Sequence, residues 1–301
     1  MKHQESNIKL KIIYLTLEMP KEAKIRAAMS YKLHKDYNII ISPEKLRSLF
    51  SGYILDDRVL NIIKSDDFQE WLQFIDDHVE FHDRIRNPYG IFNIVKTYAE
   101  NNGKYTTKEI DWTYDDGTVK KRTVKDKYIA NDSNEYVIVM LDHVSLLQPE
   151  KGETLHQSIS KFSSEYCLHM RDVWNYIPVV VQQQSAHSEQ QQFTLRGDTI
   201  VDKLKPSADG LAENKLTSRD CDMMIGLFWP HRYNIEEHHN WNLTRIGNYH
   251  RELIVLLNRN GSSNLSLDLY MNGASNFFKE LPQEPSNKVY NYIEINEQNE
   301  I

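Results

Sequence analysis

Two acidic side chains stand directly after apolar runs of the sequence. Asp142 follows the run Tyr-Val-Ile-Val-Met-Leu, and Glu18 follows the run Ile-Ile-Tyr-Leu-Thr-Leu. A carboxylate beside a buried strand is costly unless it is hydrogen-bonded or bound to a cation, so Asp142 is a candidate for holding Mg²⁺. Glu18 is a candidate for polarising an attacking water. The alternatives are a solvated loop aspartate at 142 and, at 18, an acid stabilised by a helix macrodipole.

A third polar side chain, Gln184, follows the apolar run at 177–181. Its amide could donate to a phosphate oxygen and so report the state of a bound nucleotide. Because three glutamines stand in a row at 182–184, a solvated polar loop is the alternative interpretation.

These side chains need strands and helices to position them. Short apolar runs predict buried strands at 12–17, 136–141, 177–181, 223–228, 252–257 and 263–270. Helical spacing of apolar residues predicts helices at 21–34, 43–50, 56–87, 88–100 and 154–170. Apolar strands alternating with helices indicate an α/β fold with a mainly parallel sheet. In such sheets ligands bind beyond the carboxyl ends of the strands, where all three polar side chains lie.

Residues 104–128 have a different pattern. Lys, Thr, Asp and aromatic residues alternate around Asp115-Asp116-Gly117, which predicts an exposed β-hairpin insertion. We expect one core domain at 1–282 that contains this hairpin, followed by a polar tail at 283–301.

Composition excludes several classes of protein. The 301 residues are 40% hydrophobic and 11% aromatic, which excludes a disordered chain. No apolar stretch approaches the length of a membrane span, and the first residues lack the apolar region of a signal peptide. Cys167 and Cys221 are far apart, which argues against a disulfide framework and favours the cytoplasm. The net charge of −7 does not favour a protein that coats DNA non-specifically.

Histidines offer weaker signals. His78 and His82 have the i, i+4 spacing of a helical metal site, but this spacing is also common on surface helices. Four further histidines lie near Trp229 and Trp241 and could face a ligand or belong to a polar excursion between strands; they are His231, His238, His239 and His250.

Five segments together resemble the RecA-like ATPase core of DnaB-type replicative helicases. They occur in the family's order, as LTLEMP (15–20), VIVMLDHVSLL (137–147), IPVVVQQQSA (177–186), RDCDMMIGLFWPHRY (219–233) and ELIVLLNRNG (252–261). The resemblance implies a RecA-like three-layer fold and an ATP-hydrolysing, DNA-binding motor of DNA replication, bacterial or phage-encoded. It also implies ATP and Mg²⁺ as cofactors, single-stranded DNA as substrate, a homo-oligomeric ring of hexamer type, and a primase or helicase loader as partner.

The resemblance also implies a role for individual residues. Glu18 matches the catalytic glutamate, Asp142 the Walker-B aspartate that holds Mg²⁺, and Gln184 the glutamine that senses the γ-phosphate. Arg259 matches the arginine finger that contacts the nucleotide of a neighbouring subunit; without the resemblance it is an exposed turn arginine. The segment 196–220 falls where the family places its DNA-facing loops, and its basic residues are Arg196, Lys203, Lys205, Lys215 and Arg219.

The sequence departs from the family at two points. No GxxxxGK[ST] motif occurs, although the family carries this phosphate-binding loop before the LTLEMP strand. Leu257 stands where the family often has a lysine two residues before the finger arginine. We therefore expect this chain alone to lack full ATPase activity, as a truncated or split motor. The alternatives are a non-catalytic RecA-fold assembly or DNA-binding subunit, and a RecA- or KaiC-like recombinase-type ATPase.

Overall fold

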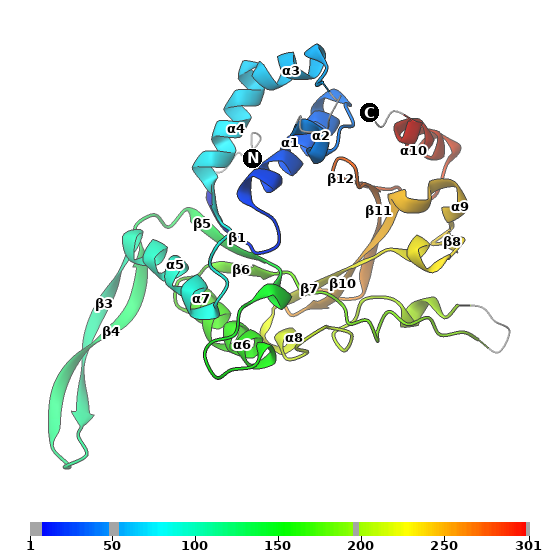
Figure 1. Ribbon diagram of the computed structural model, residues 1–301. Helices are drawn as coiled ribbons and strands as arrows, with labels where there is room; N and C mark the ends of the chain where they lie inside the picture. Colours follow the sequence, from blue (N-terminus) through cyan, green and yellow to red (C-terminus); the bar gives the residue numbers. More distant parts are fainter. Residues whose placement is uncertain (1–7, 48–53, 195–198, 299–301) are drawn as a thin grey trace. The chain divides into compact units, whose positions relative to one another are not determined.

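The computed structural model describes residues 8–47, 54–194 and 199–298 (Figure 1). The chain divides into two compact units. The first contains residues 1–18 and 71–182, and the second contains residues 19–70 and 183–301. Within the described residues, no helix is both long and apolar enough to cross a membrane.

A parallel four-stranded sheet forms the centre of the first unit. Its order is β2 (Val79–His82), β1 (Lys9–Thr16), β5 (Glu135–Asp142) and β6 (Ile177–Val180). The α/β class with a parallel sheet, predicted from the apolar runs, is confirmed. The predicted helix at 56–87 is instead α3 (Asp57–Lys64) and α4 (Asp66–His78), followed by β2, because residues 79–82 pair with β1. His78 and His82 therefore do not share a helix.

The core of the first unit packs helices against this sheet. Strand residues Ile13, Leu15, Val139 and Leu141 are buried together with side chains of the helices. The helices are α5 (Pro88–Asn101), α6 (Leu155–Lys161) and α7 (Leu168–Asp172), and a π-helical turn at Phe162–Cys167 joins the last two. A capping box at Thr154 begins α6, because Thr154 and Gln157 each bond the other's backbone N–H.

The predicted hairpin insertion is confirmed. β3 (Gly103–Thr113) and β4 (Val119–Ala130) form a two-stranded antiparallel ribbon, and Figure 1 shows it extending away from α5. Its turn contains Gly117 at a φ of 80°, a conformation that glycine adopts without steric cost. The Asp116 carboxylate accepts hydrogen bonds from the backbone and the hydroxyl of Thr118, which closes the turn.

The second unit contains an antiparallel sheet. Its order is β12 (Phe277–Glu280), β11 (Leu265–Asn272), β10 (His250–Asn258) and β7 (Met223–Phe228). Three strands that we expected in one mainly parallel sheet thus pair antiparallel in a second sheet. The connection from β10 to β11 is too short for the crossover that parallel neighbours require.

Helices and a small hairpin complete the second unit. The core contains Phe228, Trp241, Tyr270 and Ile293, all buried. Besides α3, the other elements include α1 (Lys21–Tyr37), α2 (Pro43–Leu46), α8 (Thr217–Asp220), β8 (Glu237–His238), β9 (Trp241–Asn242), α9 (Leu243–Ile246) and α10 (Asn287–Gln298). The last helix lies within the segment predicted as a polar tail, and it contributes Ile293 to the core because one face of this helix is apolar.

Candidate functional site

The strands β1 and β5 bring the two predicted carboxylates to one edge of the parallel sheet. Thr16 lies opposite Asp142 in the register, and the Leu17 N–H donates to the Asp142 carbonyl oxygen at 2.9 Å. Glu18 is the next residue. Neighbouring strands are about 4.8 Å apart, so Glu18 and Asp142 follow adjacent strands, with Glu18 two residues beyond the position opposite Asp142.

Asp142 is partly buried and held by a neighbour on β1. The Tyr14 hydroxyl donates to the Asp142 Oδ2 atom at 3.1 Å. The peptide bond between Asp142 and His143 is cis. His143 is buried, and its Nδ1 atom has no hydrogen-bond partner among the residues that the structure describes. In the sequence, the only signal of His143 is its place directly after the aspartate that ends the strand.

Glu18 is exposed, and the side chain of Arg86 contacts the preceding residue, Leu17. Arg86 donates from its Nη2 atom to the Leu17 carbonyl oxygen at 2.9 Å. Arg86 follows β2, so the carboxyl ends of three adjacent parallel strands present an arginine, a glutamate and an aspartate. Arg86 carried no signal in the sequence, because residues 79–82, which form β2, were predicted as part of a helix.

Gln184 belongs to the second unit, and a loop of that unit holds its amide. Its Nε2 atom donates to the Ser207 carbonyl oxygen at 3.2 Å, and its Oε1 atom lies 3.4 Å from the Ser207 N–H. A Cβ atom on Gly210 would overlap this Oε1 atom, so glycine at this position leaves room for the Gln184 amide. Gln184 is thereby joined to the segment that we predicted to face DNA.

Arg259 is exposed in the turn after β10. Its backbone N–H donates to the Asp222 carbonyl oxygen at 2.9 Å, and its guanidinium donates to the carbonyl oxygen of Arg219. Two predicted basic residues, one for the nucleotide and one for DNA, therefore lie side by side in the second unit.

The predicted DNA-facing cations differ in their surroundings. Lys203, Lys215 and Arg219 are exposed, and Arg196 lies outside the described residues. Lys205 is partly buried, and its Nζ atom lies 3.3 Å from Glu252 Oε1. The charge of Lys205 is therefore engaged within the protein.

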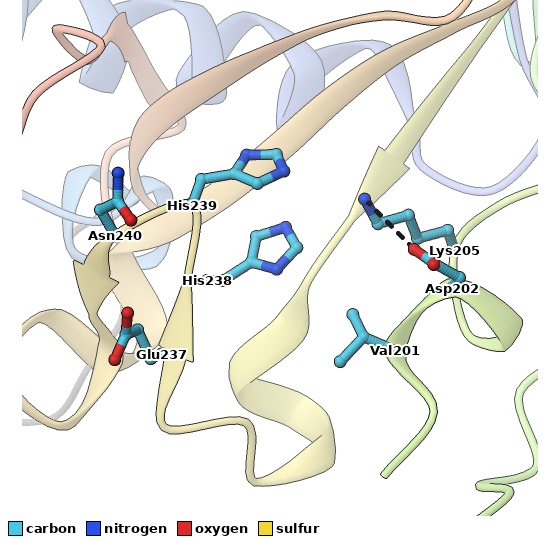
Figure 2. Close-up of a pocket in the computed structure, with 7 residues that line it drawn as sticks. All are labelled: Val201, Asp202, Lys205, Glu237, His238, His239 and Asn240. Atoms are coloured by element: carbon cyan, nitrogen blue, oxygen red, sulfur yellow. Dashed lines mark ion pairs between the residues drawn. The ribbon is translucent and has the colours of Figure 1, made fainter.

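Lys205 lines an open pocket of about 430 Å³ in the second unit (Figure 2). Histidines and acids form most of its wall, which consists of Val201, Asp202, Lys205, Glu237, His238, His239 and Asn240. His238 and His239 belong to the group of histidines seen in the sequence. Their neighbour Glu252, on β10, carried no signal in the sequence because it opens an apolar run.

Comparison with known proteins identifies the fold. No family model and no curated protein matches this sequence. A solved DnaB-like replicative helicase, studied with its interactions with primase, is 16% identical at a TM-score of 0.61; the match covers 91% of this chain and 52% of that one. A second solved structure, an ATPase domain, is 16% identical at a TM-score of 0.59, covering 91% of this chain and 75% of that one.

The chain thus has the RecA-like fold of DnaB-type helicase ATPase domains, as the resemblance implied. It spans about half the length of the first of these two solved chains.

Proposed function

We propose that this chain is the ATPase motor domain of a DnaB-like DNA helicase, which couples ATP hydrolysis to movement along single-stranded DNA. One observation carries the proposal. Glu18 and Asp142 leave adjacent parallel strands at the ligand-binding edge of a sheet, in a fold shared with helicase ATPase domains over 91% of the chain.

Asp142 is the residue proposed to hold Mg²⁺. Its carboxylate oxygens are hard ligands of the kind that Mg²⁺ prefers, and the hydrogen bond from Tyr14 fixes the direction of the carboxylate. The residues at this edge therefore fit the ion. Mg²⁺, when bound, neutralises charge on phosphate oxygens.

The other residues receive complementary roles. Glu18 is exposed, so a water can reach its carboxylate and be oriented for attack. Gln184 senses the γ-phosphate through the loop that contains Ser207, and Arg259 contacts the nucleotide of a neighbouring subunit. This last role requires a neighbouring copy of the chain, and we propose that the copies form a hexameric ring.

DNA and protein partners follow from the same proposal. The exposed cations Lys203, Lys215 and Arg219 would contact phosphates of single-stranded DNA, together with Arg196. Lys205 contributes less, because it is already paired with Glu252. A primase or a helicase loader is the proposed protein partner, and the bacterial cytoplasm, with phage origin as one source, is the proposed location.

A second candidate is a non-catalytic RecA-fold subunit that supports assembly or DNA binding. It is favoured by the absence of GxxxxGK[ST] from these 301 residues, because that loop supplies the main phosphate cradle of the fold. We accordingly propose that this chain alone hydrolyses ATP slowly. A recombinase-type ATPase is a further alternative, which the helicase neighbours disfavour.

Titration with a fluorescent ATP analogue tests the proposal. We expect Mg²⁺ to tighten binding to the purified chain, and single-stranded DNA to tighten it further. Asp142→Asn should remove the Mg²⁺ effect and weaken binding at least about tenfold, equivalent to about 1.4 kcal/mol. The control Asp132→Asn alters a half-buried acid outside the proposed site, which pairs with Lys9, and should bind like the unmodified chain.

Each result separates the candidates. Nucleotide binding that is equal with and without Mg²⁺, or equal in Asp142→Asn, would refute the role of Asp142. DNA binding with no nucleotide binding at any concentration would support the non-catalytic subunit. ATP turnover at the rate of a complete helicase would refute the proposal that this chain alone is slow.

A further inference from the structure

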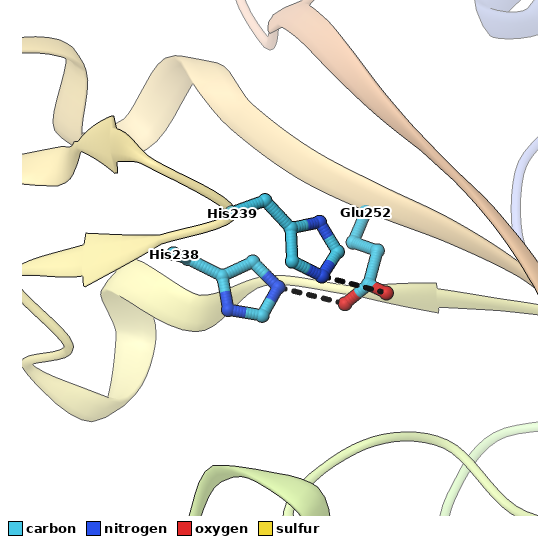
Figure 3. A group of neighbouring side chains, drawn as sticks. All are labelled: His238, His239 and Glu252. Carbon is cyan, nitrogen blue, oxygen red and sulfur yellow. Dashed lines mark hydrogen bonds and ion pairs between the residues drawn. The ribbon is translucent and has the colours of Figure 1, made fainter. Parts of the chain in front are cut away.

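Two adjacent histidines and one buried glutamate meet in the second unit, and none of the three belongs to the proposed ATPase site. His238 ends β8 and His239 begins the turn to β9, while Glu252 lies on β10. One ligand atom from each of the three residues lies within 4.8 Å of the other two. Figure 3 shows both imidazole rings directed at the carboxylate.

The turn of the small hairpin sets the two rings side by side. His239 and Asn240 both have positive φ, 49° and 66°, as the central residues of a type I′ turn do. Histidine and asparagine are among the residues that tolerate this region best. As a result the two imidazoles stack, with ring centroids 4.1 Å apart.

The distances suit a small tetrahedral ion. His238 Nε2 lies 2.8 Å from Glu252 Oε2, and His239 Nε2 lies 3.6 Å from Glu252 Oε1. Ligands at about 2.0–2.1 Å from a tetrahedral Zn²⁺ are about 3.3 Å apart. Both distances to the Glu252 carboxylate, one to each of its oxygens, lie within about half an ångström of this separation.

A second carboxylate orients one of the ligands. Asp268 Oδ1 lies 3.1 Å from His239 Nδ1 and 3.0 Å from His250 Nε2. When Nδ1–H of His239 donates to Asp268, the Nε2 lone pair faces Glu252. A metal-binding histidine commonly has this arrangement, in which the other ring nitrogen donates to a carboxylate.

The charges around the cluster favour a cation. Two carboxylates, those of Glu252 and Asp268, lie within hydrogen-bonding distance of these histidines. Lys205 is the ammonium group that pairs with Glu252.

Access to the cluster is open. His238 and His239 line the 430 Å³ pocket, and so does Lys205. Lys205 Nζ also lies 3.9 Å from the exposed Asp202, so its flexible side chain can move from Glu252 toward solvent when an ion enters. The pocket then leaves a fourth coordination position for water.

We propose that His238, His239 and Glu252 bind a divalent transition-metal ion, with Zn²⁺ the ion that best suits two imidazoles and one carboxylate. The ion ties the β8–β9 hairpin to β10, and Asp268 orients His239 from behind. Mg²⁺ is not the ion proposed for this site, since Mg²⁺ prefers oxygen ligands and two of the three ligands here are imidazole nitrogens. The site is independent of the ATPase proposal, because it uses none of Glu18, Asp142, Gln184 or Arg259.

The first experiment is calorimetric titration of the purified, metal-stripped chain with Zn²⁺. We expect one ion per chain. His239→Ala should weaken binding by more than about 100-fold, and Asp268→Asn by about 10–100-fold. The control His187→Ala removes an exposed histidine of the same unit and should leave the affinity unchanged. Absence of saturable one-to-one binding, or equal affinity in His239→Ala, overturns the proposal.

Lys205→Met provides a test in which the Zn²⁺ affinity is expected to rise, not fall. Removal of the competing ammonium should tighten Zn²⁺ binding by about tenfold, whereas loss of a merely structural ion pair would not strengthen any metal site. An unchanged or weaker affinity in this variant contradicts the proposal, even if the histidine variant does not fold.

Co²⁺ reports the geometry in the unmodified chain. We expect the intense visible absorption of a tetrahedral Co²⁺ site, displaced by one equivalent of Zn²⁺. The weak spectrum of octahedral, hydrated Co²⁺ overturns the assignment.

Discussion

His34 makes the stability of the second unit depend on pH. It lies on α1, is buried, and places its Nδ1 atom 2.6 Å from Ser275 Oγ. The Ser275 hydroxyl donates to Asn272 Oδ1, so His34 Nδ1–H is the donor to Ser275. The other nitrogen, Nε2, has no hydrogen-bond partner among the described residues. A proton on Nε2 would therefore be buried without an acceptor.

The size of the effect follows from this burial. Desolvation lowers the pKa of His34 from 6.5 to about 4. Because the folded state disfavours the proton, the contribution of neutral His34 is complete above pH 6.5 and is lost as the pH falls toward 4. At pH 5, which is 1.5 units below 6.5, the loss is about 2 kcal/mol at about 1.36 kcal/mol per unit.

Urea unfolding at pH 8 and pH 5 measures this loss by tryptophan fluorescence. The unmodified chain loses stability between the two values through all its titrating groups. In His34→Leu this loss should be smaller by about 2 kcal/mol. Ser275→Ala is the control, since it removes the hydrogen-bond partner but keeps the buried imidazole, and its pH dependence should match that of the unmodified chain. An equal loss in His34→Leu and the unmodified chain would refute the reasoning.

Three further variants probe the framework of the first unit by thermal or urea unfolding. Thr154→Ala removes the capping box of α6 and should cost about 1 kcal/mol, whereas no change would mean that the cap is not formed. Leu141→Ala, beneath the proposed site, should lower the free energy of unfolding by about 2–5 kcal/mol. The control Ile54→Ala alters a side chain in the second unit that is 88% exposed, and it should cost less than about 0.5 kcal/mol. Similar values for both variants would contradict the described core. Gly103→Ala should cost about 1–3 kcal/mol, because its Cβ would overlap the Tyr128 ring at the base of the hairpin; a neutral result would mean that the two strands separate there.

The local sequence was sufficient to predict those elements whose residue pattern does not depend on pairing with other segments. The hairpin was predictable because Asp115-Asp116-Gly117 carries its own turn chemistry between alternating strands. Short β2 was not predictable, because four residues after a long helical pattern have no distinctive period; they become a strand by pairing with β1. The helix at 287–298 is likewise polar in composition, and its apolar face becomes evident only where the helix packs against the core.

For the proposed site, the sequence by itself determined which residue types end the apolar strands: Glu18 after one and Asp142 after another. Only the tertiary structure decided that these two strands are neighbours, and that Arg86 stands at the same edge. It also brought Glu252 to His238 and His239, and Gln184 to Ser207. The physical reason is that periodicity reports what one segment buries, whereas strand order and side-chain convergence depend on pairing between segments distant in the chain.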